Sequence, residues 1–301
     1  RALLAGRRAG PARALPLSTV RRCLVRGPER EMLFGWGRAN YARSLVYRPR
    51  RRAEVAEAMA DVRRRGLTVA HRGAGQSYGD AALNQGGAIL ATKGLDRILS
   101  FDPEEGRIRA EAGVTVDRLW RRVLPEGWWP PVVPGTSRPT LGGCLAMNVH
   151  GKNHVQAGSF AEHVRSATVM RPDGEVEEHR QGKGGLARHV GAQGTTGTIL
   201  ALEIDLKRVR SGYLRVEART AGSLDETMET LRGLAETHEH SVAWLDCFAS
   251  GRSLGRAEIH GASGVELDHS RAGDGLTMDD QLPPDRVLGI VPRRRLATLL
   301  R

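Results

Sequence analysis

The chain is poor in aromatic residues, in cysteine and in long hydrophobic runs. Only 4% of its 301 residues are aromatic although 40% are hydrophobic, so aliphatic side chains must build most of a core. Its three cysteines, Cys23, Cys144 and Cys247, lack paired spacing, which excludes a disulfide framework or cysteine zinc site and predicts reduced thiols in a cytoplasmic protein. We expect no metal site. No run of about 18 apolar residues occurs, so we also expect no transmembrane segment.

The net positive charge comes from the N-terminal segment. Residues 1–52 hold 14 arginines and two acidic residues, Glu29 and Glu31, so this segment accounts for the whole formal net charge of +12. A basic arm on a neutral body is a weaker nucleic-acid signal than a basic stripe across a folded face, and we expect no nucleic-acid partner. We predict that residues 1–30 are a disordered basic leader.

Strand and helix patterns alternate along the rest of the chain. Short apolar runs predict strands over residues 45–47, 67–70, 88–91, 98–101, 107–112, 164–170, 175–179 and 198–206, and helical spacing predicts helices over 51–65 and 116–123. The order strand, helix, strand over 45–71 favours a parallel pair with a right-handed crossover. Past residue 210 the pattern restarts, with strands expected over 213–218 and 241–248 and a helix over 224–234. We therefore predict an α+β fold with one unit over 31–210 and another over 211–301.

A glycine-rich loop follows the strand expected at 67–70. It reads Arg72-Gly73-Ala74-Gly75-Gln76-Ser77-Tyr78-Gly79-Asp80. Glycines let main-chain N–H groups converge on an anion, and a pyrophosphate is the natural guest. The GxGxxxG spacing is neither the dinucleotide fingerprint nor a Walker loop. Taken alone, the loop is equally compatible with a structural turn.

Several further segments occur in a recognisable order. They are Gly35-Trp36-Gly37-Arg38, Pro134-Gly135-Thr136, Thr140-Leu141-Gly142-Gly143-Cys144, Met147-Asn148-Val149-His150-Gly151-Lys152-Asn153-His154, Gly191-Ala192-Gln193-Gly194-Thr195-Thr196-Gly197-Thr198-Ile199 and Ser223-Leu224-Asp225-Glu226-Thr227. Over about residues 34–257 the chain resembles the PCMH-type FAD-binding half of the vanillyl-alcohol oxidase superfamily. Within it, the pattern is most similar to the decaprenylphosphoryl-ribose 2-oxidases.

The resemblance implies a fold and a set of site residues. The fold is a two-subdomain FAD-binding domain over 31–210, followed by an incomplete α+β substrate (cap) domain over 211–301, because relatives continue for well over a hundred residues past the matched region. FAD would be bound by Arg72, Gly73, Ala74, Gly75, Gln76, Ser77, Tyr78, Gly79, Asp80, Gly135, Thr140, Leu141, Gly142, Gly143, Met147, Asn148, Val149, His150 and Ile199. The catalytic residues would be His150, Lys152 and Tyr78.

Individual residues within these segments have alternative interpretations. His150 would stabilise the reduced flavin or hold substrate, or be a histidine bonded only to backbone. Lys152 would meet a substrate phosphate or sugar hydroxyl, or be a solvated surface charge. Cys144 is expected in the core rather than as a reactive thiol. Gln76 stands where many relatives attach FAD through a histidine, so the resemblance implies noncovalent FAD.

The implied function is an FAD-dependent oxidation of a sugar secondary alcohol. The substrate would be a lipid-linked sugar, oxidised at the 2-hydroxyl of a polyprenylphosphoryl-ribose on the route to cell-wall arabinan, with a short-chain reductase as partner. The protein would be cytoplasmic, with a peripheral place at the cell membrane also compatible. Three alternatives stay open: an aldonolactone or alditol oxidase of the same superfamily, a noncatalytic flavin-binding remnant, and a basic-arm nucleic-acid binder.

Overall fold

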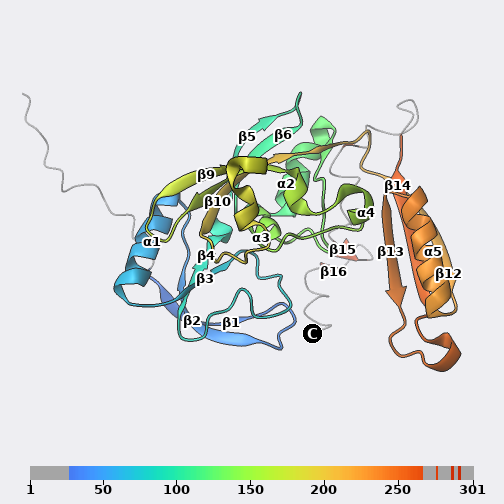
Figure 1. The fold of residues 1–301 in the computed structure, drawn as a ribbon, viewed down its shortest axis with the longest axis horizontal. Coiled ribbons are helices and arrows are strands. Elements are labelled where there is room, and N and C mark those ends of the chain that lie inside the picture. Colours follow the sequence, from blue (N-terminus) through green and yellow to red (C-terminus); the bar gives the residue numbers. More distant parts are fainter. Residues whose placement is uncertain (1–26, 267–275, 277–285, 288–290, 293–301) are drawn as a thin grey trace, which may run out of the picture.

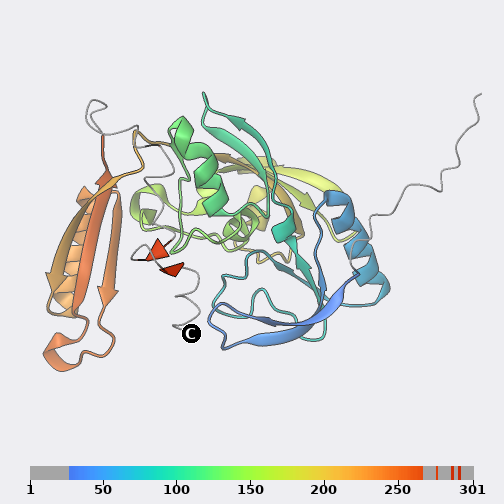
Figure 2. The same cartoon turned by 180° about the vertical axis from the view of Figure 1, so that it is seen from behind.

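The computed structural model describes residues 27–266, together with 276, 286–287 and 291–292. The expected leader therefore lies outside the described residues up to residue 26, while its last two residues, Glu29 and Arg30, open strand β1. The chain forms one main body of two sheets, with a smaller sheet-and-helix unit beside it (Figure 1). Figure 2 shows the same arrangement from behind.

The first sheet has four strands in the order β1-β2-β4-β3. Its elements are β1 (Glu29–Phe34), β2 (Tyr41–Tyr47), α1 (Arg52–Arg64), β3 (Val69–Arg72) and β4 (Ala88–Ala91). Strands β2 and β3 are parallel, as expected, but the prediction that they pair directly is wrong because β4 lies between them. Ala88, Ile89 and Leu90 are fully buried, and a strand with such side chains is most stable with partners on both edges.

Helix α1 covers one face of this sheet. Its predicted apolar stripe is confirmed, since Val55, Met59 and Val62 are buried against Leu45 and Leu90. A helix with apolar residues at this spacing is held mainly by the face that it buries.

The second sheet is antiparallel throughout, in the order β5-β6-β10-β8-β9. Its strands are β5 (Ile98–Asp102), β6 (Arg107–Glu111), β8 (Val164–Met170), β9 (Val176–Arg180) and β10 (Thr198–Asp205). Helices α2 (Val116–Val123) and α3 (Leu141–Ala146) pack on it and share its core. The helix expected at 116–123 and the hairpin at 164–179 are confirmed.

Short elements complete the main body. They are β7 (Trp128–Trp129), which pairs with β11 (Lys207–Arg208), and helix α4 (His154–Ala157). Turns of 3₁₀ helix cover Thr92–Gly94, Leu124–Glu126, Phe160–His163, Gly182–Gly184, Leu186–His189 and Gly251–Ser253.

The smaller unit is a three-stranded sheet covered by one helix. It consists of β12 (Leu214–Ala221), α5 (Leu224–Thr237), β13 (His240–Leu245) and β14 (Ala257–Gly264), with β14 in the centre. The restart of the pattern after residue 210 is confirmed, whereas β14 was not expected, because its sequence contains two glycines and no clear apolar alternation. A two-residue pair, β15 (Arg286–Val287) and β16 (Val291–Pro292), follows. Among the described residues, no helix has the length and apolarity needed to cross a membrane.

Candidate functional site

The glycine segments that are far apart in the sequence meet in the main body. A Cβ atom at Gly73 would collide with the hydroxyl of Thr140, so the loop after β3 lies directly against the start of α3. At the other end of α3, the Gly191 N–H donates to the Leu145 carbonyl over 3.1 Å. The three segments identified in the sequence therefore surround α3, which brings them to one place on the fold.

The Arg72 side chain packs against the glycine-rich loop that follows β3. The Arg72 guanidinium donates to the carbonyls of Phe34 (2.8 Å) and Ala82 (3.2 Å), and it fills the space beside Gly75, whose φ is +67°. Burial lowers the pKa of Arg72 and also lowers that of His71 to about 4, so the histidine is neutral and the arginine carries the charge. In the described part of the chain no carboxylate pairs with Arg72. The loop thus has an uncompensated positive charge, which favours an anionic ligand.

A polar atom without a partner lies in the same loop. Gln76 Oε1 is buried and accepts no hydrogen bond from any described residue, while Gln76 Nε2 donates to the Ala74 carbonyl over 3.3 Å. A buried acceptor left unpaired costs about 1–3 kcal/mol, so a donor from a ligand or water is expected there.

Gln76 also lines a cavity of about 450 Å³. The lining residues are Ala74, Gln76, Lys93, Thr115, Asp117, Ser137 and Arg138. Lys93 and Arg138 add positive charge to its wall. The residues from Lys93 to Arg138 in this list were not identified from the sequence. Thr115 does have a recognisable local role, because a threonine directly before a helix is a common N-cap, and its hydroxyl accepts from Arg118 N–H at the start of α2. Together with the glycine loop, these residues fit a large ligand that carries phosphate groups.

Two expected cofactor residues lie in the hydrophobic core. Leu141 is fully buried and Ile199 is 8% exposed, so their side chains fill the space between α3 and the second sheet. The prediction that Cys144 is a core residue is confirmed, because it is fully buried and its burial raises the pKa of the thiol to about 12. Thr140 is the N-cap of α3, where its hydroxyl accepts from the Gly143 N–H. Burial in the hydrophobic core therefore accounts for Leu141, Cys144 and Ile199 without a ligand.

Other expected cofactor residues are reachable from solvent. Met147 is 41% exposed, Gly135 has open space around it, and Asn148 has φ +43° with its side-chain oxygen accepting from Ala161 N–H. Ser77, Gly79 and Asp80 continue the loop, whereas Gly142 is buried within α3 and Val149 packs against the core. Met147, Gly135 and the loop residues 77–80 are therefore the expected cofactor positions of this group that solvent reaches.

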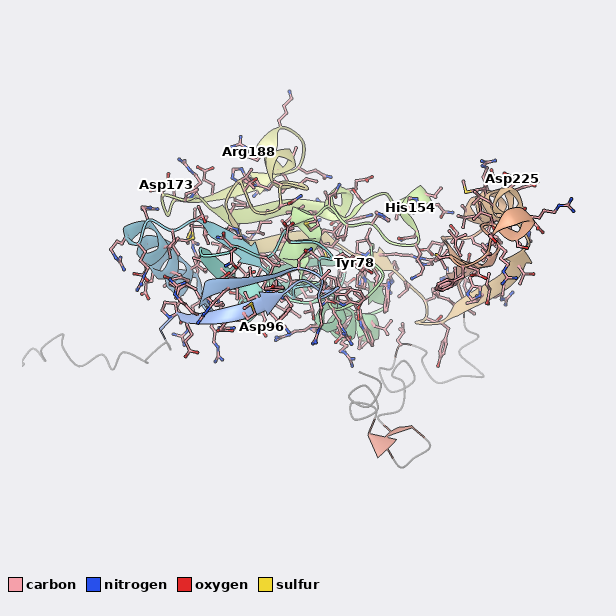
Figure 3. All side chains as sticks on the ribbon, turned by 90° about the horizontal axis from the view of Figure 1, so that it is seen from below. Tyr78, Asp96, His154, Asp173, Arg188 and Asp225 are labelled. Atoms are coloured by element: carbon pink, nitrogen blue, oxygen red, sulfur yellow. The ribbon has the colours of Figure 1, made fainter. Side chains whose placement is uncertain are left out.

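Tyr78 and His150, two of the expected catalytic residues, pack against different aromatic neighbours. Tyr78 is 74% exposed and packs edge-on against Trp36, with ring centroids 4.9 Å apart. His150 is exposed, with its ring centroid 5.2 Å from that of His154 on α4. Figure 3 shows His154 on the side of the main body that faces the smaller unit, and Tyr78 nearer its centre. Among the described residues, neither a hydrogen bond nor a ring pair joins Tyr78 to His150.

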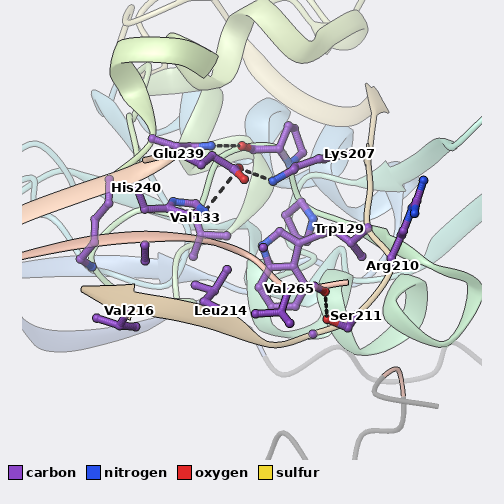
Figure 4. Close-up of a pocket in the computed structure, with 18 of the residues that line it drawn as sticks. Trp129, Val133, Lys207, Arg210, Ser211, Leu214, Val216, Glu239, His240 and Val265 are labelled. Atoms are coloured by element: carbon purple, nitrogen blue, oxygen red, sulfur yellow. Dashed lines mark hydrogen bonds and ion pairs between the residues drawn. The ribbon is translucent and has the colours of Figure 1, made fainter. Parts of the chain in front are cut away.

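Lys152 lines a second cavity, of about 630 Å³, between the main body and the smaller unit. Its walls include Trp129, Val133, Leu214 and Glu239 (Figure 4). Lys152 and Trp244 also line it. The Lys152 carbonyl accepts from Ser241 N–H over 2.9 Å, so the first residues of β13 hold the segment that carries Lys152. The sequence did not reveal this cavity, because its walls come from segments more than a hundred residues apart.

An ion pair crosses the cavity wall. Lys207, at the end of the main body, pairs with Glu239, the residue before β13, and His240 Nε2 lies 3.3 Å from the same carboxylate (Figure 4). The hydrogen bond from His240 and the contact with Lys207 lower the pKa of Glu239 to about 2. The carboxylate is therefore charged at neutral pH and links the two units. Within the described residues, no three His, Cys, Asp or Glu side chains are grouped in a way that could hold a metal ion.

Comparison with known proteins identifies a family. The family described as "FAD binding domain" matches residues 44–180. Decaprenylphosphoryl-beta-D-ribose oxidase of Mycolicibacterium smegmatis is 37% identical over 242 residues, covering 78% of this chain and 52% of that protein. Mouse L-gulonolactone oxidase is 29% identical over 134 residues, covering 44% of this chain and 30% of the relative.

A solved structure shares the fold. An alkyldihydroxyacetonephosphate synthase superposes with a TM-score of 0.61 at 14% identity, covering 74% of this chain and 47% of that one. The chain spans about half the length, 52%, of its relative from Mycolicibacterium smegmatis. The family match over β2 to β9, the relative at 37% identity and the shared fold agree with the glycine segments gathered around α3. The chain therefore belongs to the vanillyl-alcohol oxidase superfamily and carries its PCMH-type FAD-binding domain.

Proposed function

We propose that this chain is the flavin-binding part of an FAD-dependent oxidoreductase that oxidises the 2-hydroxyl of a polyprenylphosphoryl-ribose. The observation that carries the proposal is the position of the His150–His154 segment. It connects the glycine segments around α3 to the cavity beside Lys152, and the smaller unit holds it there through Ser241. The 37% identity to a decaprenylphosphoryl-beta-D-ribose oxidase supports the choice of substrate.

The residues present fit FAD. The N–H groups of Gly73 to Gly79 and the charge of Arg72 would hold its pyrophosphate, and the unpaired Gln76 Oε1 would accept a hydrogen bond from a hydroxyl or N–H group elsewhere on FAD. FAD, when bound, supplies the acceptor for the two electrons that leave the carbinol carbon. Glutamine has no nucleophilic atom suited to flavin attachment, so we propose that FAD is bound noncovalently.

Lys152 and His150 have different proposed roles. A substrate phosphate would accept a charge-assisted hydrogen bond from the Lys152 ammonium at the wall of the cavity. His150 is exposed beside the glycine segments, where its imidazole would hold the reacting hydroxyl or take its proton. The product, a keto sugar, would pass to a partner reductase that completes an epimerisation.

The test is anaerobic flavin bleaching by polyprenylphosphoryl-ribose in the natural full-length protein. Lys152→Ala should weaken substrate binding by roughly ten- to a hundredfold with unchanged flavin content, because a charge-assisted contact is lost. His150→Ala should instead lower the rate of bleaching at saturating substrate. Lys183→Ala, at an exposed lysine that does not line the cavity, is the matched control and should behave as wild type. Equal bleaching by all four proteins would remove both residues from the site.

An aldonolactone oxidase is the second candidate. The similarity of mouse L-gulonolactone oxidase over 44% of this chain favours it. Bleaching by aldonolactones, followed by rapid reoxidation in air, would support this function over the first. Flavin that stays oxidised with both substrate classes would instead support a noncatalytic flavin-binding protein.

A further inference from the structure

A histidine joins the two sheets where the glycine loop begins. His71 lies in β3, directly before Arg72, the first residue of the loop. Its Nε2 lies 2.7 Å from Oγ1 of Thr198, the first residue of β10, so a hydrogen bond joins β3 of the first sheet to β10 of the second (Figure 1). Thr198 is 1% exposed. The sequence patterns did not single out His71 as a cofactor-site residue.

The His71 ring also packs against a second glycine segment. Gly194, in the turn over residues 191–197, has φ +83°, and a Cβ atom there would lie 2.7 Å from Nδ1 and 3.1 Å from Cγ of His71. A backbone this close to an imidazole favours glycine, both for its left-handed conformation and because glycine lacks a side chain. One ring therefore contacts the turn at Gly194 and bonds Thr198, the residue that follows the turn.

The other bonds of this turn lead away from the glycine loop. Two N–H groups of the turn donate to carbonyls at the end of α3 over 3.1 and 2.9 Å. Thr196 Oγ1 lies 2.8 Å from Nδ1 of His189, which belongs to the segment before the turn. In the part of the chain that the structure describes, the bond between His71 and Thr198 is the one hydrogen bond between the end of the turn and the strand that leads into the glycine loop.

The imidazole of His71 is uncharged at neutral pH. Burial lowers the pKa of His71 to about 4, so the ring has one N–H donor and one acceptor nitrogen. It can share a hydrogen bond with the Thr198 hydroxyl without placing a second positive charge beside Arg72. His71 therefore contributes geometry to the loop, whereas Arg72 contributes charge.

We propose that His71 is a positioning residue for FAD, which holds the glycine loop and the 191–197 turn at the separation that the bound cofactor requires. A loop whose N–H groups already converge loses less conformational entropy on binding an anion than a loop that is ordered only by the ligand. The inference rests on the proposed FAD site and not on the proposed substrate. Its failure in FAD titrations would therefore be distinct from a failure of flavin bleaching by polyprenylphosphoryl-ribose.

Titration of the apoprotein of the full chain with FAD measures the effect on the cofactor. Thr198→Val removes the hydroxyl with little change of shape and should weaken FAD binding roughly three- to tenfold, the effect of one lost hydrogen bond. His71→Ala should weaken it about tenfold or more, because the ring contact with Gly194 is lost as well. His71→Gln, whose amide can still bond the Thr198 hydroxyl, should recover most of the affinity. The double variant His71→Ala/Thr198→Val should bind FAD as His71→Ala does, since both changes remove the same bond.

Thr227→Val is the matched control. Thr227 is 2% exposed, and its Oγ1 donates to the Gly255 carbonyl over 2.8 Å within the smaller unit. Each valine substitution removes one buried hydrogen bond, so both should lower the Tm of the apoprotein by a similar amount. Only Thr198→Val should weaken FAD binding. Equal affinities of the two valine variants for FAD would overturn the proposal, because the bond at Thr198 would then matter only for general stability or not at all.

Hydrogen exchange of the apoprotein reads the order of the loop directly. The amide hydrogens of residues 73–79 should exchange faster in Thr198→Val than in wild type, and at the wild-type rate in Thr227→Val. Unchanged exchange over this loop in Thr198→Val would overturn the proposal. This result is independent of His71→Ala, so the test stands even if that variant does not fold.

Discussion

Replacing Gly75 by alanine tests whether the glycine loop depends on both its backbone conformation and its arginine support. Gly75 has φ +67°, a left-handed conformation that costs an alanine about 1 kcal/mol. An added Cβ would also lie 2.7 Å from Cζ of Arg72, so the guanidinium must move. Loss of one of its two hydrogen bonds to carbonyls adds about 2 kcal/mol, for a total of about 3 kcal/mol.

Gly66→Ala is the matched control. Gly66 has a nearly identical φ of +64°, but a Cβ there meets nothing within 4 Å, so only the backbone cost of about 1 kcal/mol applies. For about 240 described residues, 1 kcal/mol corresponds to a Tm change of about 2–4 °C. We therefore expect Tm to fall by about 2–4 °C in Gly66→Ala and by about 6–12 °C in Gly75→Ala.

Circular dichroism of the apoprotein gives both Tm values, and titration with FAD gives the affinity. Gly75→Ala should also bind FAD more weakly than wild type, because the displaced arginine and altered loop lie at the proposed pyrophosphate site. A Gly75→Ala variant that melts no lower than Gly66→Ala, or binds FAD as wild type does, would refute the assignment of this loop.

Three further outcomes follow from particular residues. Because Gln76 cannot attach flavin, acid precipitation of the FAD-loaded protein should give a yellow supernatant, and a yellow pellet would contradict noncovalent binding. Glu239 has a folded pKa of about 2 against an ordinary value of 4.5, so its ion pair stabilises the fold above pH 4.5, and this stabilisation is lost as pH falls towards 2. When the free energy of unfolding is measured against pH, Glu239→Gln should therefore reduce the slope between pH 4.5 and 2. An unchanged slope would mean that the ion pair contributes nothing to stability. Cys144 should not react with a thiol reagent at pH 8 in the native protein, because it is buried and its pKa is about 12, whereas the exposed Cys247 should react. Cys247→Ala should therefore lower the number of fast-reacting thiols, and Cys144→Ala should leave it unchanged.

Local patterns in the sequence were sufficient to predict most of the helices and strands. The apolar spacing of α1 and α2 and the turn between β8 and β9 depend on residues close together in the chain, and each was predicted close to its observed bounds. The core position of Cys144 was also predicted, because a free cysteine usually behaves as a small buried apolar residue. The cofactor class came from the order of the glycine segments, which the family match over residues 44–180 supports.

Contacts between distant segments decided the rest. Strand β4 lies between β2 and β3, and its side chains are the most completely buried of the sheet. Which strand takes the central position depends on comparing the burial of all four strands, and the sequence of one strand does not give that comparison. Leu141 and Ile199 lie in the core although their motifs indicated a ligand.

The sequence by itself determined which segments are strands, helices and glycine turns, because backbone preference and apolar periodicity act over a few residues. Only the tertiary structure decided which segments surround a cavity and which apolar side chains are buried or exposed. The cavity beside Lys152 needs the smaller unit at its wall, and Leu141 and Ile199 are buried because α3 packs on the second sheet. Burial depends on what the rest of the chain places nearby, and that information is spread over the whole fold.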